Sequence, residues 1–312
     1  MTQTAALLLL AYGTPTGPED IEPYYTHIRH GRPPTPELLA ELTERYQAIG
    51  GVSPLLQIAR DQAQGVAELL KKCLPDTDVH VLLGMKHAHP FIEEAVAELA
   101  SLSVERALAL VLAPHYSTMS VAEYQQRVTA SAQQHGGLDI KLINEWHLEP
   151  GYIAMLGRRV QSQLTGLRGQ GAKRIRTLFT AHSLPTRILE TGDPYPQQLQ
   201  ETAQAVAQML GLDDWGVGWQ SAGRTSDPWI GPDICEVIRD LGADGQHDGV
   251  LVCPAGFVSD HLEVLYDLDI QAREVAHEVG LGFARTPSPN ADTEFVEVLA
   301  QLASTHLGEQ AA

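Results

Sequence analysis

Apolar runs alternate along most of the chain with segments whose apolar residues recur at helical spacing. The runs are AALLLLAYG, VHVLLGMKH, ALALVLAPHYS, RTLFTAHS, WGVGWQSAG and DGVLVCPAG, and the helical segments include PELLAELTERYQAI, FIEEAVAELASL and YPQQLQETAQAVAQML. Strands that are apolar on both faces and alternate with helices are typical of parallel sheets in α/β proteins. Two of the runs, LALVLAPHYST and IRTLFTAHSLPT, are weakly similar. The pattern therefore predicts two similar α/β domains, with a boundary near residues 144–152.

Polar residues follow each apolar run. Ligands of open α/β sheets bind beyond the carboxyl ends of the strands, so these six endings together predict a binding rim. The residues are Tyr12; Lys86, His87 and His89; His115, Tyr116 and Ser117; His182 and Ser183; Gln220 and Ser221; and the group Ser259, Asp260, His261 and Glu263.

Each ending also has a structural explanation. His182 fits a hydrogen-bonded core histidine equally well, and Asp260 and Glu263 have the spacing of a helix capping pair. If Glu263 begins a helix, Asp267 and Gln271 follow on the same face. Such a polar file is either a relay for a hard cation or a solvated helix face.

Composition and charge narrow the class of protein. The chain has 39 acidic and 21 basic residues and a net charge of −18, so it repels nucleic acid and anionic lipid. No apolar stretch approaches the about 20 residues that cross a bilayer, and the start lacks the marks of a signal peptide. The three cysteines lie far apart and form no disulfide framework. We expect a cytoplasmic protein that neither binds nucleic acid nor inserts into a membrane.

Two further patterns bear on the chemistry. The segment HIRHGRPP is locally basic, and it is either a solvated loop or an anion-docking patch. The chain contains no G-x-S-x-G elbow, no P-loop and no G-x-G-x-x-G after the first strand. A serine hydrolase and a nucleotide-binding protein are therefore not supported.

Motifs along nearly the whole chain resemble those of the ferrochelatases, most of all the soluble bacterial coproporphyrin III ferrochelatases. The motifs are LLLAYGTP, IEPYYTHIRHGRPP, RYQAIGGVSPL, GMKHAHPFIEEAV, VLAPHYST, TAHSLP, GDPYPQQL, VGWQSAGRTSDPWIGPD and GFVSDHLEVLYDLD. The resemblance implies two Rossmann-like domains with parallel sheets and a porphyrin cleft between them. It assigns residues 1–147 and a returning C-terminal helix in 286–312 to the N-terminal domain, and residues 148–285 to the C-terminal domain.

The activity that the resemblance implies is insertion of ferrous iron into coproporphyrin III, which gives coproheme in haem biosynthesis and releases two protons. Such an enzyme is a metal-inserting lyase that takes iron as a substrate, and we expect neither a permanent cofactor nor an iron–sulfur cluster. Transient contact with neighbouring haem-pathway enzymes is also consistent with it. The alternatives are a protoporphyrin IX ferrochelatase, a sirohydrochlorin-type cobalt or nickel chelatase, and a non-catalytic tetrapyrrole or metal carrier.

The resemblance also carries roles onto single residues. His182 and Glu263 match the pair that handles metal and protons on one porphyrin face, and Tyr12 matches the axial ligand of the product iron on the other. Positions that hold the macrocycle and its carboxylates, or line the cleft, are Arg29, Arg45, Tyr46, Ser53, Tyr124, Lys86, His87 and Trp229. One departure is Gln271, where the family pattern has a glutamate beside Arg45 and Asp267; a neutral amide weakens that outer metal site.

Overall fold

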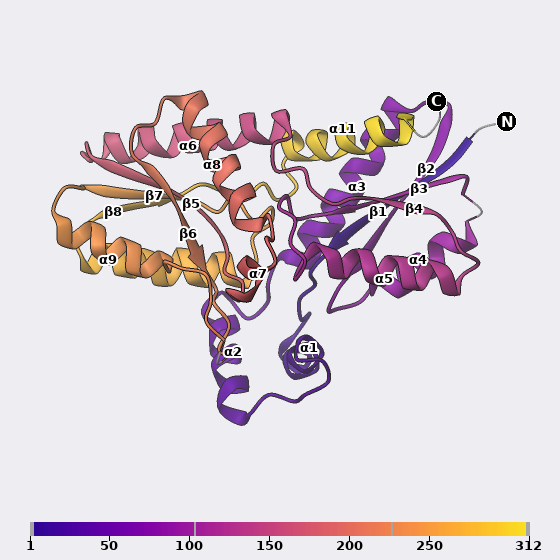
Figure 1. Cartoon of the computed structure of the whole chain (residues 1–312), viewed down its shortest axis with the longest axis horizontal. Coiled ribbons are helices and arrows are strands. Elements are labelled where there is room, and N and C mark those ends of the chain that lie inside the picture. Colours follow the sequence, from indigo (N-terminus) through magenta and orange to yellow (C-terminus); the bar gives the residue numbers. More distant parts are fainter. Residues whose placement is uncertain (1–2, 103, 226, 310–312) are drawn as a thin grey trace. The chain divides into compact units, whose positions relative to one another are not determined.

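The computed structural model describes residues 3–102, 104–225 and 227–309. This part of the chain divides into two compact units (Figure 1). Unit 1 comprises the residues up to Ala113, Ser120–Glu145 and the residues from Pro289 onward, and unit 2 comprises Pro114–Met119 and Trp146–Ser288. The short segment Pro114–Met119 thus groups with unit 2, although the sequence-based assignment had it in the N-terminal domain. The other boundaries differ from the predicted ones by a few residues.

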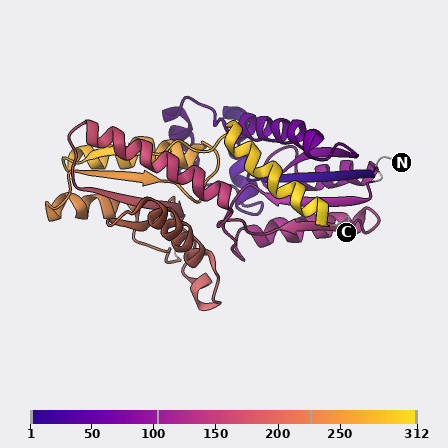
Figure 2. The same cartoon turned by 90° about the horizontal axis from the view of Figure 1, so that it is seen from above.

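Unit 1 is a parallel four-stranded sheet in the order β2-β1-β3-β4. Its strands are β1 (Gln3–Ala11), β2 (Thr77–Met85), β3 (Arg106–Val111) and β4 (Ile140–Ile143). Its helices are η1 (Pro18–Asp20), α1 (Ile21–Ile28), α2 (Pro36–Ala48), α3 (Leu55–Cys73), α4 (Ile92–Ser101), α5 (Val121–Gln134) and α11 (Thr293–Glu309). Helices α3 and α11 pack together on one face of the sheet and α4 and α5 on the other (Figures 1 and 2). The middle of β1 is fully buried because helices cover both of its faces.

Unit 2 repeats this architecture with the strand order β6-β5-β7-β8. Its strands are β5 (Ile175–His182), β6 (Trp215–Gln220), β7 (Gly249–Cys253) and β8 (Gly282–Arg285). Its helices are α6 (Pro150–Gly169), α7 (Arg187–Glu190), α8 (Tyr195–Leu210), α9 (Ile234–Asp244), the π-helix η2 (Val264–Ala272) and α10 (Arg273–Glu278). Helices α6 and α8 contact each other, and α9, α10 and η2 form a second group. Helix α9 begins at a capping box between Asp233 and Glu236.

The fold class predicted from the sequence is confirmed, since both units are α/β with parallel sheets of the same strand order. The proposed repeat paired the wrong strands, however. LALVLAPHYST contains β3 and IRTLFTAHSLPT contains β5, whereas the shared order makes β1 the counterpart of β5. Buried parallel strands with polar endings resemble one another wherever they lie in the sheet, so local similarity alone does not identify the partner.

None of the helices in the described part of the chain combines the length and the apolar character that a bilayer-spanning helix needs.

Candidate functional site

His182 is the last residue of β5, where it pairs in register with Gln220 of β6. Its Nδ1 lies within hydrogen-bond distance of the Ser183 carbonyl oxygen. A carbonyl only accepts, so Nδ1 carries the proton and Nε2 of the neutral ring keeps its lone pair. The Tyr195 hydroxyl donates to the His182 carbonyl over 3.0 Å, which secures the backbone at this point. His182 therefore offers one ring nitrogen to a proton or a metal ion.

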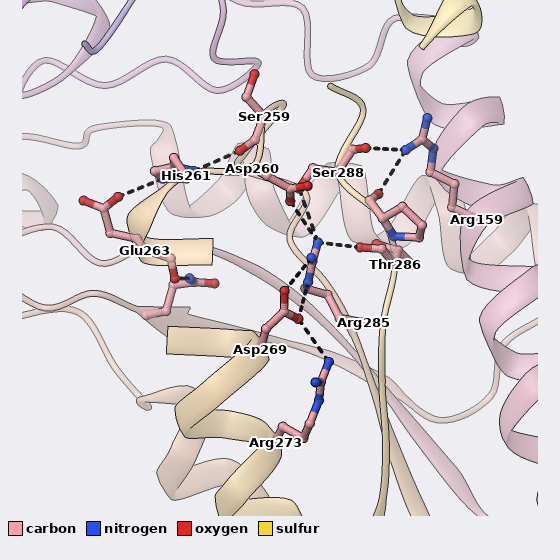
Figure 3. A network of polar contacts seen from close by, with 12 residues as sticks. Arg159, Ser259, Asp260, His261, Glu263, Asp269, Arg273, Arg285, Thr286 and Ser288 are labelled. Atoms are coloured by element: carbon pink, nitrogen blue, oxygen red, sulfur yellow. Dashed lines mark hydrogen bonds and ion pairs between the residues drawn. The ribbon is translucent and has the colours of Figure 1, made fainter. Parts of the chain in front are cut away.

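Glu263 lies in the segment that follows β7, and its partner is His261 (Figure 3). The Nε2 atom of His261 is 3.0 Å from Oε2 of Glu263, while its Nδ1 donates to the Ser259 carbonyl over 2.9 Å. The two side chains are 16% and 27% exposed. Because Nδ1 already holds one proton, a second proton is shared along the line between Nε2 and the carboxylate.

Opposing effects set the charge of this pair. Burial alone would raise the pKa of the Glu263 carboxyl, but the charge and hydrogen bond of His261, with a smaller contribution from His182, hold that pKa well below its usual range. Burial alone would lower the pKa of His261. Its attraction to Glu263 is the stronger effect, so the pKa of His261 lies above the ordinary value. Both shifts favour the form of the pair in which His261 is an imidazolium and Glu263 a carboxylate.

Gln220 connects the two predicted site residues. Its side-chain amide donates to the Glu263 carbonyl over 3.1 Å, and its own carbonyl accepts from the Ser183 amide over 2.7 Å. The Thr180 hydroxyl donates to the Gln220 side chain over 2.9 Å. The structure thus brings His182 and Glu263 together at the carboxyl ends of β5 and β7 within unit 2. Trp229, another predicted site residue, also lies there, with its ring centroid 6.3 Å from that of His182.

The π-helix η2 continues from Glu263 beside a hollow of about 440 Å³. Asp267 and Gln271 line this hollow, together with Ser221, Arg239 and Glu274. Ser221 has a left-handed φ of 62° and donates its hydroxyl proton to Asp267. No group of three or more His, Cys, Asp or Glu in the described chain is arranged to hold a metal ion. Asp267 and Gln271 line the same hollow, as expected from their spacing. Glu263, which was expected on the same face, instead pairs its carboxylate with His261.

Unit 1 brings four predicted residues together at the ends of β1 and β2. The ring of Tyr12, which is 40% exposed, lies 4.6 Å from the ring of His87. The ammonium of Lys86 lies 5.8 Å from the Tyr12 ring centre and 5.3 Å from that of Tyr124, and pairs with Glu123 over 2.6 Å. Burial, and then the charge of Lys86, lower the pKa of His87 to about 3, so its ring is neutral. The cluster therefore consists of an exposed phenol, Tyr12, whose ring faces the buried ammonium of Lys86.

The remaining predicted residues of unit 1 differ in exposure. Arg29 is partly exposed, and its Nε donates to the Arg32 carbonyl while Nε of Arg32 donates to that of Arg29, both over 3.2 Å. Tyr46 and Ser53 are buried, and the Tyr46 hydroxyl lies 3.4 Å from that of Thr14. Arg45, in the last turn of α2, is partly buried. A role for these residues in holding carboxylates stays a prediction.

Sequence reasoning did not assign a role to His261 or Gln220. His261 is visible in the motif SDHLE, two residues before Glu263, but its partner depends on how the segment turns. Gln220 was noted only as a strand ending. Gln220 pairs in parallel register with His182, and this strand pairing is the feature that could have identified Gln220 as a site residue.

Comparison with known proteins gives a family and several relatives. A family model described as Ferrochelatase matches residues 4–307. The coproporphyrin III ferrochelatase of Anoxybacillus flavithermus is 44% identical over 304 residues, covering 97% of this chain and 96% of that protein. The coproporphyrin III ferrochelatase of Bacillus subtilis is 43% identical over 302 residues, covering 97% of each. Among solved structures, SirB from Bacillus subtilis with Fe3+ has a TM-score of 0.58 at 11% identity and covers 98% of both chains, which shows a shared fold.

Proposed function

This chain belongs to the ferrochelatase family, and from that premise we propose that it inserts ferrous iron into coproporphyrin III and releases two protons. The observation that carries the proposal is that His182, with an available ring nitrogen, lies close enough to the anionic Glu263 in unit 2 to contribute to the low pKa of its carboxyl. Relatives that are 41% to 45% identical over nearly their whole length bear the name coproporphyrin III ferrochelatase.

Metal insertion exchanges two pyrrole protons for one divalent cation, so the site needs a proton acceptor and a weak metal ligand. His182 accepts a pyrrole proton on Nε2, since its Nδ1 proton is committed to the Ser183 carbonyl. Glu263 is a poor proton acceptor while His261 holds its pKa low. Its carboxylate instead stabilises protonated His182 and offers oxygen to the incoming iron. Protons leave to solvent through His182, which is only partly buried.

Coproporphyrin has four carboxylates, and unit 1 supplies the cationic groups proposed to bind them. Arg29 and Arg45 can make charge-assisted hydrogen bonds to carboxylates, with the hydroxyls of Ser53 and Tyr124 as further donors. The net charge of −18 opposes such a polyanion. Physiological salt screens charges beyond about 8 Å, so the arginines nearest the substrate decide the local potential. Tyr12 is proposed as the axial ligand of the product iron.

The test is anaerobic turnover of free-base coproporphyrin with ferrous iron by the wild-type chain and by His182→Ala. The wild type should make many equivalents of product, and His182→Ala should lose at least about 100-fold in kcat, as expected for a general base. His247→Ala is a matched control because His247 is also a partly buried histidine, and it is paired with a carboxylate, that of Asp214 just before β6.

Three results would contradict the proposal. Near-full turnover by folded His182→Ala removes the assigned base. One equivalent of bound product from the wild type indicates a carrier. Faster turnover of protoporphyrin than of coproporphyrin overturns the choice of substrate.

A further inference from the structure

Arg285, the last residue of β8, uses all of its side-chain nitrogens within unit 2 (Figure 3). Its Nε and Nη2 donate to the two carboxylate oxygens of Asp269 over 2.8 and 2.7 Å. Its Nη1 lies 3.3 Å from Oδ1 of Asp260 and also donates to the Thr286 carbonyl over 3.1 Å. The side chain is only 11% exposed. A bidentate arginine–carboxylate pair that is mostly shielded from solvent fixes geometry far better than an exposed ion pair does.

The two carboxylates that Arg285 holds flank the segment that carries Glu263. Asp260 precedes His261 directly, and Asp269 lies within η2. One guanidinium therefore fixes the chain on both sides of the His261–Glu263 pair. A π-helix is rare and has weaker intrinsic support than an α-helix, so contacts that hold the chain just before η2 and within it would stabilise this helix.

We propose that Arg285 is a positioning residue for metal insertion: by clamping Asp260 and Asp269, it holds the His261–Glu263 pair in place beside His182. This inference rests on the proposed role of Glu263. Arg285 acts through these two carboxylates, and it is tied to neither Glu263 nor His182 by a hydrogen bond or ion pair in the described structure.

The variants Arg285→Ala and Arg285→Lys test the clamp by separating charge from geometry. The alanine variant should lose about 10- to 100-fold in kcat, the range expected when a group that orients a ligand is removed. Lysine keeps the positive charge, but its single ammonium cannot bind both carboxylate oxygens of Asp269 and also reach Asp260. The kcat of Arg285→Lys should therefore also fall. Coproporphyrin binding, followed by fluorescence titration, should change by less than about twofold in both variants. Guanidinium ion added to Arg285→Ala should restore part of the lost kcat.

Arg273 provides the matched control. It lies 3.4 Å from the same Asp269 carboxylate, but its side chain is 60% exposed. Exposed pairs contribute little to stability, so Arg273→Ala should keep the wild-type kcat. The alanine variants at both positions are compared at a temperature where tryptophan fluorescence shows unit 2 to be folded.

A double-mutant cycle with Glu263→Gln separates positioning from general damage. If Arg285 acts through Glu263, adding Arg285→Ala to Glu263→Gln should cost little further activity. An equal loss in both backgrounds, or a wild-type kcat in folded Arg285→Ala and Arg285→Lys, overturns the proposal. If Glu263→Gln retains the wild-type kcat, the proposed role of Glu263 is wrong. If Glu263→Gln is impaired but both Arg285 variants keep the wild-type kcat, only the proposed role of Arg285 is wrong.

Discussion

Replacing His261 by alanine leaves Glu263 in a partly buried position without its cationic partner. In the wild type, Nε2 of His261 is 3.0 Å from the Glu263 carboxylate, and the pKa of Glu263 is lowered from 4.5 to about 2. At about 1.4 kcal/mol for each tenfold change, this corresponds to about 3 kcal/mol of stabilisation. Breaking a buried pair by removing one partner costs about 3–5 kcal/mol. Since the Glu263 side chain is 27% exposed, we expect the lower end, about 3 kcal/mol.

The loss should depend on pH in a specific way. Glu263 has a depressed pKa, so its contribution is present above the unfolded value of about 4.5 and is lost as the pH falls toward the folded value. His261 has a raised pKa, so its contribution is present below about 6.5 and is lost as the pH rises through the folded value. The stability difference between wild type and His261→Ala should therefore be largest between about pH 4.5 and 6.5 and should shrink by pH 9.

Urea unfolding followed by tryptophan fluorescence measures this difference. The four tryptophans, at 146, 215, 219 and 229, all belong to unit 2, so their signal follows the unit that contains the pair. His247→Ala is the control, because His247 is similarly buried, 14% exposed, and pairs with Asp214 over 2.9 Å. A stability loss in His261→Ala that stays constant from pH 5 to pH 9 would refute the ion-pair reasoning.

Two further substitutions test the other predicted metal contacts. Tyr12→Phe should change the absorption spectrum of bound iron coproporphyrin by removing a phenolate ligand, and an unchanged ligand-field pattern would rule that ligand out. Gln271→Glu adds a carboxylate to the hollow that Asp267 and Glu274 line. It should tighten Mn2+ binding by about tenfold or more in calorimetry, and an affinity equal to that of the wild type would show that the hollow is not an outer metal site.

The sequence predicted the longer strands of the described chain and missed the shortest ones. The middle of β1 is a continuous apolar run without exposure, and β5 and β7 are nearly as buried, so their patterns are unambiguous. Strands β4 and β8 were not predicted. Each has four residues and lies at a sheet edge, where most of its positions are partly exposed. Such short strands owe their conformation to the neighbouring strand, a contact that hydrophobic periodicity does not encode.

For the site, sequence identified residue types better than it identified partners. His182 and Glu263 were selected from their motifs, but the groups that orient them were not: the Ser183 carbonyl, Gln220 at the end of β6, and His261. Arg285 could not be selected at all, because its carboxylates lie 25 and 16 residues away in sequence. Hydrogen-bond direction and burial, which set charge and tautomer, exist only once the chain has folded.

The repeated architecture bears on why the proposed function assigns proton acceptance to unit 2. In the shared strand order β1 corresponds to β5, and the chain leaves them as Ala11-Tyr12-Gly13-Thr14-Pro15 and Ala181-His182-Ser183-Leu184-Pro185. Tyr12 follows the last residue of β1 and His182 is the last residue of β5, so the two residues lie at the carboxyl ends of corresponding strands. Neutral imidazole takes up a proton near neutral pH, whereas a phenol has no basic lone pair of comparable strength. The neighbours reinforce the difference, since Lys86 brings a cation to Tyr12 and Glu263 brings an anion to His182. In the proposed function, the end of β1 therefore supplies an oxygen ligand and the end of β5 a proton acceptor, and this difference follows from one side chain and the charge beside it.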